Sequence, residues 1–99
     1  MIGMDIKTRK AEYPELFEIL SALLFKVDPI GINFETNFDE YESEVATIIP
    51  RLPHAKSAAD VQLIVHEEFC RWFDDETVGS INNYNDLAFQ IWAEWLRYR

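Results

Sequence analysis

Apolar residues recur at helical spacing along four stretches of the chain, and proline, glycine and asparagine fall between the stretches. Residues three and four apart lie on one face of an α-helix, so this spacing predicts amphipathic helices that each bury one side. Only residues 31–36 resemble a short extended piece, and an isolated strand has nothing to pair with. The pattern therefore predicts an all-α fold, a single compact four-helix bundle with short connections, in one domain over residues 1–99.

Prolines set the expected ends of the first two helices. The first helix is expected over residues 13–27, because Pro14 suits its first turn and Pro29 disfavours helical geometry at the residue before it. The second is expected over about residues 38–49, with Asn37 as its N-cap. Pro50 should kink or end this second helix, since it lacks an amide donor and clashes with the preceding turn.

The third and fourth helices are expected in the second half of the chain. Ser57 is followed by Asp60 three residues later, which marks a helix start, and this helix should end in the acidic residues 74–77. The fourth is expected to start at residue 82 or 83 and to continue to the C-terminus as "YNDLAFQIWAEWLRYR". Its polar stripe is narrow, so it should be either central to the bundle or partly a partner surface.

Charge narrows the possible partners. The chain has 18 acidic and 9 basic residues, a net charge of −9, and residues 11–50 hold nine acids against one base. Such a charge repels phosphate backbones and anionic membrane surfaces, so we expect no direct nucleic-acid binding and no membrane binding. It attracts and steers basic proteins. An acidic run is also common on an ordinary solvated helix face, but its segregation into part of a small fold favours a binding surface.

Three features are the expected contacts with a partner. Like charges on one helix face cost a few tenths of a kcal/mol, which favours a binding role for the acids of the second helix. The acids of "FDDET" are expected after a helix C-terminus, the unfavourable end of the dipole. The ring of Tyr98, near the chain end, is the aromatic ring that we expect to be most exposed and available to a partner. The predicted contact residues are Glu35, Asp39, Glu40, Glu42 and Glu44 as the main group, Asp74, Asp75 and Glu76 as the second, and Tyr98.

Side chains that carry catalysis or bind metals are sparse. His66 and Cys70 lie four residues apart, but "HEEFC" lacks the second histidine of a zinc motif. The stretch "NFETNFDEYESE" lacks the frame of a calcium loop, and no nucleophile elbow or phosphate loop is present. We therefore expect no enzymatic activity, no metal and no cofactor. The single cysteine, with no signal peptide and no spanning segment, predicts a soluble cytoplasmic protein.

The stretch "DPIGI" followed by "DEYESEV" resembles a family of small helical bacterial proteins of unknown function. Sequences of this style also occur as immunity proteins beside secreted polymorphic toxins, including those of contact-dependent growth inhibition. The matching residues are Asp28, Pro29, Ile30, Gly31, Ile32, Asp39, Glu40, Tyr41, Glu44 and Val45. The resemblance implies an inhibitor that binds a cognate toxin domain, very often a nuclease, and it implies no catalytic residue.

Two further expectations accompany this resemblance. The alternative function is another intracellular protein-binding module, such as a phage-encoded nuclease inhibitor or an adaptor that pairs through its aromatic last helix. Residues 28–31 fit a type I turn, with Asp first, Pro second and Gly fourth. We expect this turn to be structural, with Ile30 and Ile32 inserted into the bundle.

Overall fold

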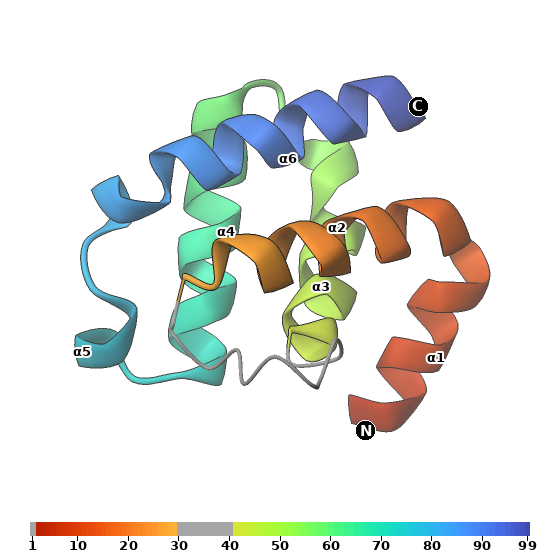
Figure 1. Cartoon of the computed structure of the whole chain (residues 1–99), viewed down its shortest axis with the longest axis horizontal. Coiled ribbons are helices and arrows are strands. Elements are labelled where there is room, and N and C mark those ends of the chain that lie inside the picture. Colours follow the sequence, from red (N-terminus) through yellow and green to blue (C-terminus); the bar gives the residue numbers. More distant parts are fainter. Residues whose placement is uncertain (1, 30–40) are drawn as a thin grey trace.

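The computed structural model describes residues 2–29 and 41–99, of which residues 2–5 are described by their backbone alone (Figure 1). The elements in chain order are α1 (Ile2–Glu12), α2 (Pro14–Val27), α3 (Glu42–Ile48), the 3₁₀ helix η1 (Ile49–His54), α4 (Ala58–Trp72), α5 (Asp75–Val78), the 3₁₀ helix η2 (Ile81–Tyr84) and α6 (Asn85–Tyr98). The all-α prediction is confirmed for this part of the chain, which contains no strand. The expected count of four helices is not confirmed, because α1 and α5 come in addition.

Two pairs of helices cross at the centre of the fold. Helices α2 and α6 contact each other and run across the view in Figure 1, while α3 with η1 and α4 run behind them. Helix α1 folds back from the start of α2 and packs against α3. The aromatic centre of the core is Phe69, whose ring lies 6.1 Å from that of Tyr41 and 5.5 Å from that of Tyr84.

Helix α2 follows the sequence prediction. Pro14 occupies its first turn, where the missing amide hydrogen costs nothing, and the leucines of its apolar stripe include fully buried Leu16 and Leu24. The helix ends at Asp28, which adopts a left-handed conformation with φ 51° and donates its N–H to the Leu24 carbonyl. The Tyr41 hydroxyl donates to the Asp28 carboxylate at 2.7 Å, which ties the end of α2 to the start of α3.

The second predicted helix is only partly described. Asn37 and the expected first turn lie outside the described residues, as do Ile30, Ile32 and the end of the expected type I turn. The described helix begins at Glu42, and Pro50 ends the α-helical geometry as expected. The chain then continues as the 3₁₀ helix η1, which holds both Pro50 and Pro53.

The start of α4 is confirmed and its end is corrected. The Ser57 hydroxyl accepts the Asp60 N–H at 3.3 Å, as the sequence predicts, but the helix ends at Trp72 rather than among the acids. The Asp74 carboxylate accepts the Thr77 N–H at 2.8 Å and begins the new helix α5. Hydrogen bonding from Thr77 holds the pKa of Asp74 below its ordinary value. The acids therefore lie at a helix N-terminus, where negative charge is favourable, and the expected unfavourable position is wrong.

Candidate protein-binding site

The irregular chain between α5 and η2 is held by side chains from other elements. The Tyr84 hydroxyl donates to the carbonyl of Val78 at 2.7 Å, and His66 Nε2 donates to that of Gly79 at 2.9 Å. The Gln62 side chain donates to the carbonyl of Ile81 at 2.8 Å. Three anchors thus hold the end of α5, Gly79 and the first residue of η2.

Gly79 makes the sharp change of direction in this stretch. Its φ of +75° and ψ of −162° belong to a region that residues with a side chain rarely adopt. A Cβ atom at this position would also lie 3.1 Å from Nδ2 of Asn83. Glycine is therefore required here to bring α5 close to the start of α6.

The end of α2, helix α5 and the first turns of α6 surround a hollow of about 480 Å³, which we name the acidic hollow. Its two acids, Glu76 and Asp86, are exposed and make no ion pair with any described residue, and no described Lys or Arg lines it. The amides of Asn83 and Gln90 lie beside them. The described lining residues are Val27, Pro29, Glu76, Thr77, Val78, Gly79, Asn83, Tyr84, Asp86, Leu87 and Gln90.

One member of the second predicted acidic group lines this hollow. Asp74, Asp75 and Glu76 are all exposed, and Glu76 lines the hollow directly. Asp86, which lines the same hollow, was not among the predicted contact residues. Ten residues separate it from Glu76, and nothing in their local sequence indicates that both line one hollow.

The main group of predicted partner contacts is only partly described, and its described members are not fully exposed. Glu35, Asp39 and Glu40 lie outside the described residues. Glu42 is half-buried and forms an ion pair with Lys10 at 3.3 Å. Glu44 is only 3% exposed, so its expected role as an accessible partner contact is wrong. Helix α3 packs against α1, α2 and α4, and this leaves it no broad solvent face for an acidic stripe.

Helix α6 has one buried and one exposed apolar flank. Leu87, Ala88, Ile91 and Trp95 are buried, whereas Phe89 and Leu96 are 65% and 42% exposed. Tyr98 is 37% exposed, and its ring contacts those of Tyr13 and Trp95 at 5.9 and 6.3 Å. Tyr98 therefore helps to attach the end of α6 to the start of α2, and its contact with a partner stays a prediction.

Cys70 lies beside a histidine and a carboxylate. Its Sγ is 3.9 Å from both ring nitrogens of His66. Burial raises the pKa of the Cys70 thiol, and so do a hydrogen bond to Asp75 and the negative charges of Asp75 and Glu67. A cysteine activated as a nucleophile has the opposite shift, toward a lower pKa.

We expect Cys70 to react with iodoacetamide severalfold more slowly than glutathione at neutral pH, because the thiolate is the reacting species. The variant Asp75→Asn should speed the reaction, since it removes a nearby negative charge. Glu76→Gln, which changes the neighbouring acid, should leave the rate unchanged. Mass spectrometry over time measures the rates. A wild-type rate equal to that of glutathione would show that the thiol is not suppressed.

Comparisons with known proteins assign neither a family nor a function to the chain. The chain matches no protein-family model, and no curated protein or solved structure matches it. Within the part of the chain that the structure describes, no three His, Cys, Asp or Glu side chains are placed to hold a metal ion. In that same part, no helix is both long enough and apolar enough to cross a bilayer.

Proposed function

We propose that the chain is an immunity protein that binds and neutralises a basic toxin domain, of the nuclease class, through the acidic hollow. One observation carries the proposal: Glu76 and Asp86 face a hollow that no described Lys or Arg lines. Asp74 and Asp75, directly before Glu76 in the chain, are also exposed and add negative charge to this segment. With a net charge of −9 behind them, these acids favour the approach of a basic protein.

The fixed backbone around the hollow supports an inhibitory role. Binding costs conformational entropy when loops must be ordered, and a preorganised surface avoids part of that cost. Here the anchors from Gln62, His66 and Tyr84 have already ordered the chain between α5 and η2. An inhibitor needs no catalytic group. It needs a rigid complementary surface and fast association, which opposite charges accelerate.

The test is the association rate with the toxin domain encoded beside this chain, measured by stopped-flow fluorescence at low and high salt. The double variant Glu76→Gln/Asp86→Asn should slow association about tenfold at low salt and much less at high salt, because salt screens steering charges. The matched control Glu15→Gln/Glu94→Gln removes the same charge away from the hollow and should slow it less than about twofold. Equal rates for both variants would reject the hollow as the contact.

The exposed flank of α6 favours a second candidate, a protein-binding adaptor or a phage-encoded nuclease inhibitor. Phe89 and Leu96 lie seven residues apart with half-buried Trp92 between them, so the three form one apolar strip. The gene neighbourhood separates the candidates. A large secreted-toxin gene directly upstream favours immunity, and a phage operon favours the second candidate.

A further inference from the structure

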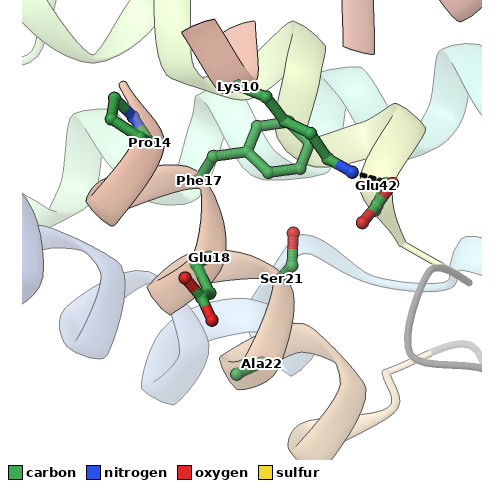
Figure 2. Close-up of a pocket in the computed structure, with 7 residues that line it drawn as sticks. All are labelled: Lys10, Pro14, Phe17, Glu18, Ser21, Ala22 and Glu42. Atoms are coloured by element: carbon green, nitrogen blue, oxygen red, sulfur yellow. Dashed lines mark ion pairs between the residues drawn. The ribbon is translucent and has the colours of Figure 1, made fainter. Parts of the chain in front are cut away.

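A pocket of about 500 Å³ lies between α1, α2 and the start of α3, away from the acidic hollow (Figure 2). Its wall is mostly apolar, with Phe17 as the largest side chain, and its polar groups come from all three helices. The described lining residues are Lys10, Pro14, Phe17, Glu18, Ser21, Ala22 and Glu42.

The Lys10 ammonium shows what chemistry the pocket accepts. Its Nζ lies 5.6 Å from the centroid of the Phe17 ring and 3.3 Å from Oε1 of Glu42, so an aromatic face and a carboxylate hold one cation. The contact with Glu42 is longer than the 2.7–2.9 Å typical of a charge-assisted hydrogen bond, by about half an ångström. The Lys10 side chain is also 51% exposed. It can therefore be displaced by a movement of its own side chain, and the incoming group must then cover the ring of the core residue Phe17.

Ser21 supplies a polar group that the protein itself leaves unused. The residue is 8% exposed, and its Oγ has no hydrogen-bond partner among the described residues. In Figure 2 this hydroxyl points to the side of the pocket where Phe17 and the pair of Lys10 and Glu42 lie. A buried hydroxyl without a partner is unfavourable, so a donor that reaches Oγ removes this penalty and binding is favoured.

The charges of the pocket select a cation over an anion. Glu18 and Glu42 carry two negative charges against the single positive charge of Lys10, and Glu18 makes no ion pair with a described residue. Displacement of the Lys10 ammonium makes Glu42 available to an incoming positive group, and Glu18 adds a second negative charge on the other side of the lining (Figure 2). An anionic ligand would meet them at close range and is disfavoured.

We infer that this pocket receives one arginine side chain of the basic protein partner. The aliphatic stem packs on Phe17, Pro14 and Ala22. The guanidinium displaces the Lys10 ammonium from Glu42 and donates to Oγ of Ser21. Arginine suits these two acceptors better than lysine, because its planar fork presents five N–H donors in fixed directions. The inference rests on the proposed function and names one contact that the partner must supply.

A titration with amino-acid amides tests the pocket without any partner protein. Methyl and aromatic NMR spectra of the full chain are recorded with N-acetylarginine methylamide and with the matched citrulline compound, which has the same shape but no charge. Saturable shifts at Ala22 and Phe17 are expected with arginine, with a Kd of a few mM, about tenfold tighter than with citrulline. Equal responses to both compounds would overturn the inference.

Two variants separate a binding role from a structural one. Lys10→Met removes the competing ammonium and should tighten arginine binding severalfold, whereas Ser21→Ala should weaken it by a similar factor. Both positions lie at the edge of the core, and thermal unfolding confirms that each variant is folded. Unchanged or weaker arginine binding by Lys10→Met would contradict the displacement step.

The partner experiment distinguishes failure of this inference from failure of the proposed function. Ala22→Phe fills the pocket from an exposed position and should weaken toxin binding at least about tenfold. Toxin binding that is tight and unaffected by Ala22→Phe would overturn the arginine pocket and leave the immunity role standing. A toxin that does not bind the wild-type chain would refute the immunity role, while the amide titration decides the pocket on its own.

Discussion

Replacement of Phe69 by alanine is expected to lower the free energy of unfolding by about 3–5 kcal/mol, enough to unfold a large fraction of a small domain. Phe69 is fully buried, and its ring lies within 6.1 Å of the ring centres of Tyr41, Phe73 and Tyr84. The substitution removes apolar surface and leaves a cavity among aromatic rings, of which those of Tyr41 and Tyr84 are held by hydrogen bonds of their hydroxyls. These two tyrosines cannot move into the cavity without breaking those bonds.

Urea unfolding followed by circular dichroism measures this effect. Phe89→Ala is the matched control, because Phe89 is the same residue type and is 65% exposed. Its effect should stay within about 0.5 kcal/mol. A loss below about 1 kcal/mol for Phe69→Ala would show that the ring is not at the centre of the core, since fully buried aromatic residues cost far more.

Replacement of Arg51 by methionine should lower the free energy of unfolding by about 2–3 kcal/mol, because it leaves the carboxylate of Glu68 buried without its closest cation. Glu68 is 1% exposed, and Arg51 Nη1 donates to it at 2.9 Å. Arg51 also donates to exposed Glu67 at 2.7 Å. The hydrogen bond with Glu67 contributes most, and that with Glu68 adds to it, in raising the pKa of Arg51 above its ordinary value. This expected loss of free energy is smaller than is usual when one partner of a buried ion pair is removed, because Arg51 itself is partly exposed.

Two further variants test this ion pair by urea unfolding. Arg71→Met should cost less than about 0.5 kcal/mol, because Arg71 is 71% exposed and its contact with Glu68 is 3.7 Å long. The double variant Arg51→Met/Glu68→Met should recover most of the loss, since an apolar pair of similar volume replaces a buried ion pair at little cost. Equal losses for the single and double variants would mean that the stem of Arg51, rather than its charge, stabilises the fold.

Helices with local signals could be predicted from the sequence. The proline at the start of α2, the residue before Pro29 and the cap formed by Ser57 and Asp60 all act within one or two turns, and the structure confirms them. Helix α1 has no such signal. It is held by distant contacts, such as the ion pair of Lys10 with Glu42, which no local pattern contains.

The sequence predicted the part of the candidate site that depends only on which acidic side chains are exposed to solvent. The acids of residues 74–76 are exposed as expected, but the N-cap formed by Asp74 and Thr77 was read as the end of a helix. Burial of Glu44 depends on how α3 packs against three helices, and this cannot be read from spacing along one helix. The placement of Glu76 and Asp86 around one hollow depends on the turn at Gly79 and on anchors from α4.

The most direct test of the proposed immunity role is growth of bacteria that express the neighbouring toxin domain that this proposal requires. Co-expression of the wild-type chain should restore growth, because the complex removes the toxin from its substrate. The variant Glu76→Gln/Asp86→Asn should restore growth less, and the control Glu15→Gln/Glu94→Gln should restore it fully. Growth arrest that persists with the wild-type chain, expressed and folded in the same cells, would contradict the account.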